Sequence, residues 1–261
     1  MKTLIGIASL LCVSMATGVH AENKIDASQE KFIAQYKKQK NLPDPADMLL
    51  NTDPEPELAE GFVDLYNGEN LDGWVPYGGY CEFEAQGEAI VGNHVKGSPS
   101  TYLSTVKDDY TDFVFTAELK WEIDNNTGII FRGDVRDGQK GQVVFGPQAE
   151  MEDENRQRFW SGGIYGQSAG GWAYPLWLEA HEEVRGAIDY RGWNRITIHA
   201  EGDVVKTWVN GIPAAHWVND EFQQGFFSLQ VHAGQKGRVL FRNIKVKELQ
   251  DTPDQSADAV E

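Results

Sequence analysis

From residue 61 to residue 249, apolar and polar side chains alternate along short runs that clusters of turn-forming residues separate. Alternation with a period of two is typical of β-strands with one buried face, and no long helical period interrupts it here. Asn210-Gly211, between two such runs, is a strong signal for a tight hairpin. So many short strands favour one all-β domain, a sandwich of two antiparallel sheets. The clearest predicted strands cover residues 113–122, 128–132, 142–151, 194–201, 203–209, 225–231 and 238–247.

The same alternation assigns the side chains of each predicted strand to a core face and an outer face. In the first of these strands, Phe113, Phe115 and Leu119 share one face, and the polar side chains between them share the other. If the apolar rows meet in the core, the polar rows of strands that share a sheet gather on one outer face. The residues predicted for that face are Glu118, Lys120, Arg132, Gln148, Glu150, Gln230 and His232.

The flanks of this domain have a different composition. Residues 1–21 are expected to be a cleaved signal peptide, because a basic residue, a short apolar stretch and Val19-His20-Ala21 follow one another. The stretch is shorter than the roughly 20 residues of a membrane-spanning helix. We therefore expect a periplasmic or secreted protein without a membrane span. Residues 22–60 are expected to form a leader helix and a Pro-rich acidic linker, and residues 250–261 a disordered acidic tail.

Charge and cysteine content restrict the partners and the means of stabilisation. The chain has 40 acidic and 23 basic residues, which gives a formal net charge of −17. Nucleic-acid binding depends on Lys and Arg that neutralise phosphates, so we expect no nucleic-acid partner. Cys12 lies in the predicted signal peptide, which leaves Cys81 as the one cysteine of the mature chain. An intramolecular disulfide is therefore excluded, and we expect Cys81 to be a small buried residue.

Several sequence motifs, in one order along residues 61–249, resemble the 3-keto-disaccharide hydrolase family, whose members are concanavalin A-like jelly rolls. The resemblance therefore implies a two-sheet jelly-roll sandwich. Cys81 stands where relatives commonly place a tryptophan, and the loop 170–177 adds two tryptophans where relatives vary. The motifs include Leu65-Tyr66-Asn67-Gly68, Leu71-Asp72-Gly73-Trp74, Gly128-Ile129-Ile130-Phe131-Arg132, Gln148-Ala149-Glu150-Met151-Glu152-Asp153, Gly162-Gly163-Ile164-Tyr165-Gly166 and Leu229-Gln230-Val231-His232.

The resemblance also implies a substrate, a glycoside whose C3 hydroxyl has been oxidised to a ketone. Such a ketone acidifies the proton on C2, so a base can remove it and the enolate can expel the glycosidic oxygen from C1. This route needs a base that titrates near neutral pH, a cation or metal at the enolate oxygen, and an acid at the leaving group. It does not need the two opposed carboxylates of ordinary glycosidases.

Three residues of the predicted polar face are candidates for this chemistry. His232 is the first choice for the base, because imidazole titrates near working pH, and its alternative is a structural hydrogen bond. Glu150 is the second candidate, as base or metal ligand, against a solvated position on a strand. Arg132 is a candidate for neutralising the enolate, against a structural salt bridge to Glu118 or Glu150.

Other residues are candidates for binding the sugar or a metal. Gln148, Gln230, Glu118 and Lys120 offer hydrogen bonds from the same face, and Trp172 and Trp177 offer aromatic surfaces for a sugar ring. Glu150, Asp153 and His232, together with Glu152, could hold a divalent cation, although no spacing in the sequence matches a strong zinc motif. The sequence establishes no cofactor, and a divalent metal stays open.

Three functions remain open on the sequence alone. The first is an exported enzyme that cleaves 3-keto-glycosides, by elimination and hydration or by direct hydrolysis. The second is a non-catalytic carbohydrate-binding module, because one fold serves both roles. The third is an interaction domain that holds a partner through the Pro-rich leader.

Overall fold

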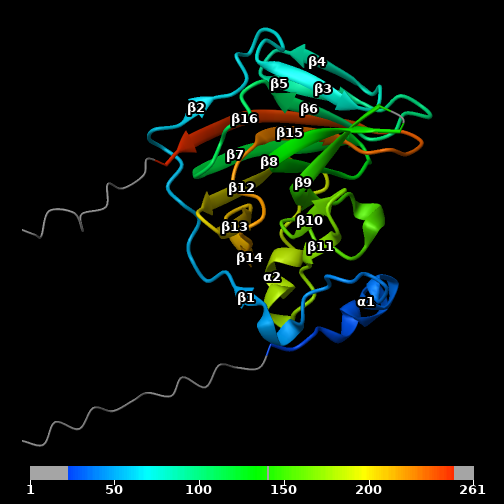
Figure 1. Cartoon of the computed structure of the whole chain (residues 1–261), viewed down its shortest axis with the longest axis vertical. Helices are drawn as coiled ribbons and strands as arrows, with labels where there is room; N and C mark the ends of the chain where they lie inside the picture. Colours follow the sequence, from blue (N-terminus) through cyan, green and yellow to red (C-terminus); the bar gives the residue numbers. More distant parts are fainter. Residues whose placement is uncertain (1–22, 140, 250–261) are drawn as a thin grey trace, which may run out of the picture.

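The computed structural model describes residues 23–139 and 141–249 and shows two antiparallel sheets packed face to face as a jelly-roll sandwich (Figure 1). The predicted all-β fold class is confirmed. The predicted signal peptide and the predicted acidic tail lie outside the described residues. In the described part of the chain, no helix is long and apolar enough to cross a membrane.

One sheet has seven strands and carries most of the predicted polar face. Its strands, in spatial order, are β11 (Gly171–Tyr174), β10 (Ile164–Gln167), β9 (Gly141–Met151), β8 (Thr127–Gly138), β15 (Phe226–Val231), β6 (Thr101–Thr105) and β3 (Trp74–Gly78).

The other sheet has nine strands, of which β2 (Val63–Asp64) pairs with β16 beside the main path. The remaining strands, in spatial order, are β1 (Leu49–Leu50), β14 (Ile212–Val218), β13 (Val204–Val209), β12 (Asn194–Glu201), β7 (Phe113–Ile123), β16 (Arg238–Glu248), β5 (Ala89–Asn93) and β4 (Glu82–Gln86). All seven strands that the alternation predicted are present, within a few residues of their predicted ends except for β8, which continues to Gly138.

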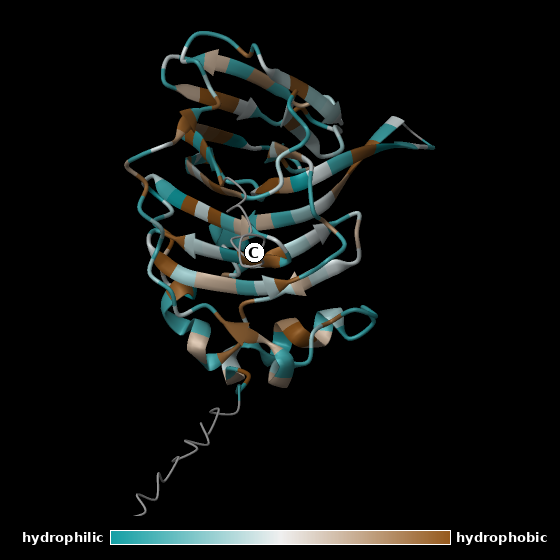
Figure 2. Cartoon of the chain, turned by 60° about the vertical axis from the view of Figure 1, so that its left-hand side comes forward, coloured by the Kyte–Doolittle hydropathy of each residue, from teal (hydrophilic) through white to brown (hydrophobic). Residues whose placement is uncertain are grey.

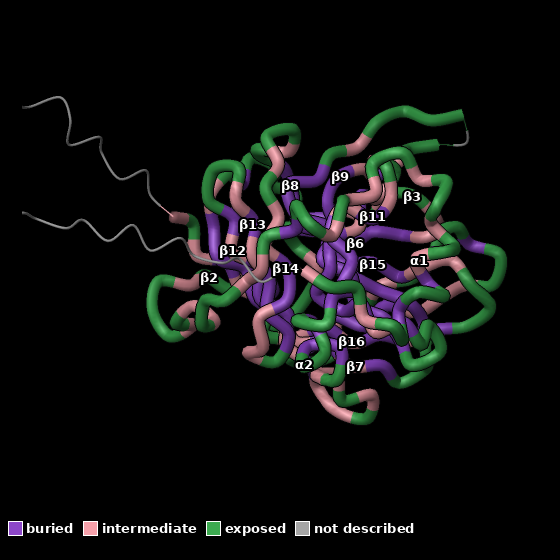
Figure 3. Tube along the Cα trace, turned by 90° about the horizontal axis from the view of Figure 1, so that it is seen from below, coloured by how far each residue is buried: buried purple, intermediate pink, exposed green. Residues whose placement is uncertain are grey.

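The core lies between the two sheets, where apolar residues of facing strands meet. In Figure 2, hydrophobic (brown) and hydrophilic (teal) positions follow one another along the strands. Phe227 of β15 packs on Phe113 and Phe115 of β7, with ring centroids 4.7 and 4.6 Å apart. The buried positions form the centre of the molecule and the exposed ones form the loops around it (Figure 3). Cys81 is buried, as expected for a small apolar residue.

The Asn210-Gly211 dipeptide forms the turn between β13 and β14, as predicted. Both residues have left-handed backbone conformations, with φ of 52° and 86°. Such a pair of positive φ values fits the twist of a two-residue hairpin, and Asn and Gly tolerate it best.

Residues 23–60, which we call the leader, contain helix α1 (Glu30–Tyr36), two 3₁₀ turns (Ala27–Gln29 and Pro45–Asp47) and strand β1. The second half of the leader was predicted to be an extended linker, but it is part of the sandwich. Leu49 and Leu50 pair with the edge strand β14, and Glu55 forms an ion pair with Arg195. The remaining helical segments are α2 (Glu182–Arg185) and the 3₁₀ turns Glu154–Arg156 and Glu179–His181.

Candidate functional site

A cavity of about 300 Å³ opens on the outer face of the seven-stranded sheet, and we call it the central pocket. Strands β9, β10, β11 and β15 supply part of its wall, and the loops before β6, β8 and β10 supply more. The side chains that line it are Tyr36, Ser100, Asn126, Gln148, Glu150, Arg156, Arg158, Tyr165, Gln167, Trp172, Gln230 and His232.

A chain of hydrogen bonds orders the floor of the central pocket. Asn126 Nδ2 and Gln148 Nε2 each donate to one carboxyl oxygen of Glu150, both at 2.5 Å. Gln148 Nε2 also lies 3.3 Å from Gln230 Oε1, and Gln230 Nε2 donates to the Tyr102 hydroxyl at 3.1 Å. Gln148 and Glu150 face the same side because they are two residues apart on β9.

A glycine leaves room for this network. Gly128 of β8 is paired with Glu150 across the sheet. A Cβ atom at Gly128 would lie 2.6 Å from Gln148 Nε2 and 2.8 Å from Gln148 Cγ, so any larger residue would displace the Gln148 side chain. The site therefore depends on a missing side chain as well as on those present.

The two titratable candidates of the pocket have pKa values shifted in opposite directions. Glu150 is fully buried, and burial raises its pKa, although the two amide hydrogen bonds and the nearby arginines partly oppose the change. Burial lowers the pKa of His232. Near neutral pH the histidine is therefore favoured as the neutral imidazole, and Glu150 keeps its proton to a higher pH than an exposed glutamate.

The backbone selects the tautomer of His232. Its Nδ1 atom lies 2.6 Å from the carbonyl oxygen of Ala233, and a carbonyl oxygen can only accept. Nδ1 therefore carries the proton in the neutral ring. The lone pair is on Nε2, which makes Nε2 the proton acceptor of this imidazole.

Three buried polar atoms of the pocket wall have no hydrogen-bond partner in the described part of the chain. They are Asn126 Oδ1, Gln148 Oε1 and Trp172 Nε1. A buried polar atom without a partner costs roughly 1–3 kcal/mol. Their residues line the central pocket, so these two acceptors and one donor are candidate contacts for a polar ligand.

Arg158 supplies positive charge to the pocket wall. It is almost fully buried, its Nε donates to Glu152 Oε1, and its Nη1 donates to the Tyr36 hydroxyl. Its guanidinium carbon lies 4.8 Å from the Trp172 ring centroid and 5.2 Å from that of Trp160. Burial raises the pKa of Glu152 to about 7 even beside this arginine.

The sequence model of one protein family, described as the 3-keto-alpha-glucoside-1,2-lyase-like domain, matches residues 61–247. The chain belongs to this family. Family membership confirms the resemblance found in the sequence and supports a carbohydrate-active function. No curated protein matches the chain.

Of three similar solved structures, the first two show the same fold at low sequence identity. A candidate glycosyl hydrolase from Parabacteroides distasonis is 19% identical, covers 76% of this chain and 100% of its own, and gives a TM-score of 0.52. A protein of unknown function with a galectin-like fold from Bacillus subtilis is 11% identical, with 68% and 90% covered and a TM-score of 0.50. A carbohydrate-binding module from Bacillus subtilis is 13% identical, with 67% and 95% covered and a TM-score of 0.47.

Within this family member, the structure brings five of the predicted site residues together. Gln148, Glu150, Gln230, His232 and Trp172 all line the central pocket. The first four come from the predicted polar face, and Trp172 comes from the loop with two tryptophans.

The alternation missed several pocket residues that lie outside regular strands. Asn126 precedes β8, Arg156 and Arg158 lie between β9 and β10, and Tyr36 lies in α1. The polar Asn125-Asn126 pair directly before a predicted strand was the one local signal. The positions of the two arginines and of Tyr36 follow from loop and helix packing, which no periodicity encodes.

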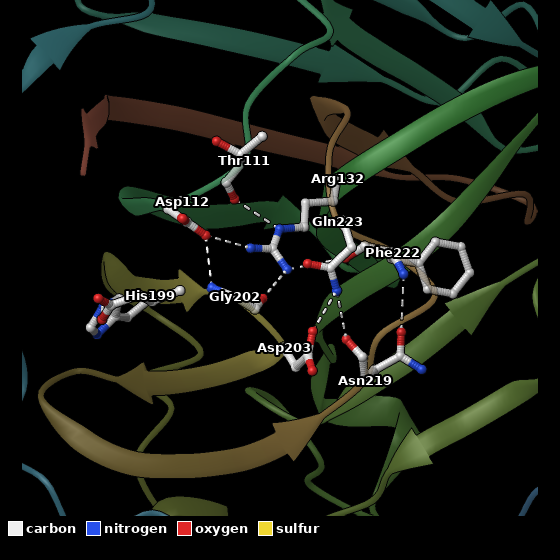
Figure 4. Close-up of polar contacts among 10 residues, drawn as sticks. Thr111, Asp112, Arg132, His199, Gly202, Asp203, Asn219, Phe222 and Gln223 are labelled. Carbon is white, nitrogen blue, oxygen red and sulfur yellow. Dashed lines mark hydrogen bonds and ion pairs between the residues drawn. The ribbon is translucent and has the colours of Figure 1, made fainter. Parts of the chain in front are cut away.

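Arg132 does not reach the central pocket, contrary to the prediction. Its Nε donates to Thr111 O at 2.8 Å, its Nη1 to Gly202 O at 2.8 Å and Phe222 O at 3.1 Å, and its Nη2 to Asp112 at 3.1 Å (Figure 4). The reason is an irregularity in β8, where the register with β9 shifts between Ile130 and Asp134 and Arg132 has a φ of 45°. The irregularity breaks the alternation that placed Arg132 on the polar face.

Glu118, Lys120 and Trp177 also lie away from the central pocket. Glu118 and Lys120 belong to β7 of the nine-stranded sheet, where Glu118 accepts from Arg242 Nε at 2.7 Å. Alternation gives the face of a strand but does not say which sheet contains the strand. Trp177 is 1% exposed, and its indole N–H donates to the Met48 sulfur, so it is a core residue.

The candidate metal ligands do not form a cation site. Residues 23–139 and 141–249 contain no group of three or more His, Cys, Asp and Glu side chains placed to hold a metal ion. Asp153 lines a neighbouring cavity of about 310 Å³, which shares Asn126, Arg156 and His232 with the central pocket. Its carboxylate accepts from the backbone N–H of Asn155, and Glu152 is paired with Arg158.

Proposed function

We propose that this protein cleaves 3-keto-glycosides in the central pocket, with His232 as the base and Glu150 as the acid. One observation carries the proposal. A histidine with a lowered pKa, whose Nε2 has no hydrogen-bond partner within residues 23–139 and 141–249, and a carboxyl group with a raised pKa line the same cavity. Raising the pKa of a carboxyl group toward neutral pH is a common way to prepare a general acid, and a neutral imidazole can accept a proton.

In the proposed reaction, His232 Nε2 removes the proton from C2 of the sugar, and the electron pair of that bond forms an enolate with the C3 carbonyl. The enolate then collapses, so that the C3 carbonyl returns, a C1–C2 double bond forms and the bond from C1 to the glycosidic oxygen breaks. Glu150 gives its proton to the departing oxygen. Addition of water across the new double bond completes a net hydrolysis.

Positive charge is available for the enolate oxygen. Arg156 and Arg158 both line the pocket, and the two hydrogen bonds of Arg158 leave its Nη2 group free of the partners named above. Hydrogen-bond donors placed where negative charge develops are often the largest contribution to catalysis. The unpaired atoms of Asn126, Gln148 and Trp172 would hold the sugar hydroxyls.

The direct test is incubation of the purified protein with a 3-keto-disaccharide, with product detection by mass spectrometry. We expect release of the leaving sugar, and a His232→Ala variant should be slower by about 10²–10⁴-fold, the usual contribution of a general base. His216→Ala is a matched control, because His216 also contacts a backbone carbonyl through Nδ1, at 3.2 Å from Leu50 O, but lies outside the central pocket. No release by the parent protein would refute the proposal.

A carbohydrate-binding module is the second candidate function. The unpaired polar atoms in the pocket support it, because they need a ligand but no reaction. Calorimetry with the disaccharide, before oxidation at C3, separates the two functions. Tight binding without turnover of the keto-sugar would favour the binding module.

We also propose that the protein acts in the periplasm or outside the cell, because residues 1–21 have the pattern of a signal peptide. Fractionation of the source cells, with N-terminal sequencing of the mature protein, tests this. A mature protein that retains residues 1–21 would contradict it.

A further inference from the structure

The leader lies outside the region that matches the family, residues 61–247, yet it reaches the central pocket. Tyr36, the last residue of α1, is one of the side chains that line the cavity. In Figure 1, α1 lies beside β11, the edge strand of the sheet that carries the pocket.

Hydrogen bonds fix the leader against the pocket wall. The Gln39 side chain accepts from the backbone N–H of Trp172 at 2.8 Å and donates to the Trp172 carbonyl at 2.7 Å. It therefore occupies both backbone groups of one residue of the edge strand. Gln29 accepts from the Trp160 indole N–H at 2.8 Å, and Asp26 is paired with Arg185.

Tyr36 connects the leader to Arg158, the buried arginine of the pocket wall. Its ring centroid lies 5.8 Å from that of Trp160 and 6.4 Å from that of Trp172. Its hydroxyl accepts from Arg158 Nη1, while Glu152 holds Nε of the same guanidinium. Arg158 is thus held at two nitrogens, and one of the two partners comes from the leader.

We propose that Tyr36 is a positioning residue, which fixes the Arg158 guanidinium in the pocket so that its remaining N–H groups face the oxyanion of the reacting sugar. The leader then completes the site of this chain, in addition to covering the edge of the sheet. The inference rests on the proposed function for its kinetic consequence but not for its structural part, which concerns Arg158 alone.

The test compares Tyr36→Phe, which removes only the hydroxyl, with the parent protein on a 3-keto-disaccharide. We expect kcat to fall about tenfold and KM to change little, because the lost contact orients a group that acts in the transition state. Arg158→Lys should lower kcat at least as much. The double variant should be no slower than Arg158→Lys alone, because Tyr36 acts through Arg158. Additive losses, or an unchanged kcat in Tyr36→Phe, would overturn the inference.

Phe32→Leu is the control for a general effect on the leader. Phe32 lies in α1 and packs on Trp160, with ring centroids 6.2 Å apart, but it does not line the pocket. The Phe32→Leu substitution should lower the melting temperature and leave kcat at 25 °C within about twofold, because it removes apolar volume from the core without touching Arg158. A loss of kcat equal to that of Tyr36→Phe would mean that the leader acts through stability alone and would overturn the positioning role.

A second measurement does not depend on turnover. Phenylglyoxal modifies arginines, and peptide mass spectrometry gives the rate at Arg158. We expect several-fold faster modification of Arg158 in Tyr36→Phe than in the parent protein, with the rate at Arg132 unchanged. If the parent protein cleaves no 3-keto-sugar, the proposed function fails, and the modification rate at Arg158 alone decides whether Tyr36 positions this arginine. Equal rates at Arg158 in the two proteins would then overturn the inference.

Discussion

Arg132 and Arg158 are both buried arginines, but their surroundings give them different roles. Arg132 donates from all three of its nitrogens, to three backbone carbonyls and to Asp112. Arg158 donates from two nitrogens, lies among aromatic rings and lines a cavity. A guanidinium that donates from all three of its nitrogens holds chain segments together, whereas one with a nitrogen left over can meet a ligand. The bonding of a buried charge, more than its burial, therefore indicates its role.

The largest effect should come from removing Arg132, the arginine that donates from all three of its nitrogens. Arg132→Ala removes the donor to three carbonyls and the ion pair of Asp112, which keeps its hydrogen bond from the Gly202 N–H. We expect the free energy of unfolding to fall by about 3 kcal/mol. The activity of the folded fraction should be unchanged, because Arg132 does not line the central pocket. Urea unfolding and activity per folded molecule measure both quantities. A specific loss of activity at unchanged stability would reverse the comparison between the two arginines.

A smaller effect, confined to the pocket, is expected for Gly128→Ala. The added Cβ would come within 2.6 Å of Gln148 Nε2, so Gln148 must move and Glu150 loses a hydrogen bond. We expect kcat/KM to fall about 10- to 100-fold, as for other small displacements in an active site. Steady-state kinetics measures this.

Gly186→Ala is the matched control for Gly128→Ala, since its new Cβ would meet nothing closer than 3.5 Å. It should leave kcat/KM unchanged. The new Cβ of Gly128→Ala would also approach Ala149 O at 2.8 Å, so its unfolding curve must be recorded beside the kinetics. Full activity in Gly128→Ala would show that the Gln148–Glu150 contact is dispensable.

The smallest effect is a gain in stability that depends on pH. Burial raises the pKa of Glu150 in the folded state, so the stability it contributes is present below its unfolded pKa and is lost as pH rises through its folded pKa. Glu150→Gln cannot ionise, and we expect it to exceed the parent protein in unfolding free energy by about 0.5–2 kcal/mol at high pH. The difference should shrink as the pH is lowered.

Urea unfolding from pH 4 to pH 9 measures this difference. Glu118→Gln, on the nine-stranded sheet, is the control for removing a carboxylate outside the central pocket, and it should not exceed the parent protein in unfolding free energy, because it gives up the ion pair with Arg242. The Glu150→Gln protein should also lose activity. Lower stability than the parent at every pH would mean that Glu150 is ionised and well compensated in its pocket, and this would remove the acid role proposed for it.

Much of the fold could be predicted from the sequence, because strands with one buried face carry a period-two pattern in their own residues. The strands that carry Gln148, Glu150 and Gln230 were predicted on that basis, and so was the Asn210-Gly211 hairpin. Short strands such as β10 and β11 were not among the clearest predictions, because four residues give a weak pattern.

How the predicted strands and the leader are arranged in the sandwich depended on tertiary structure. The sequence could not show that β7 belongs to the other sheet, that β8 has an irregularity at Arg132, or that the leader packs against β11. Each of these results from contacts between residues far apart in the chain, which a local pattern does not record. The sequence by itself determined the all-β fold class, the acidic net charge and the polar residue types that β9 and β15 bring to the pocket. Only the tertiary structure decided that Arg158 and Tyr36, rather than Arg132, complete it, because the positions of loop and helix side chains follow from packing and not from periodicity.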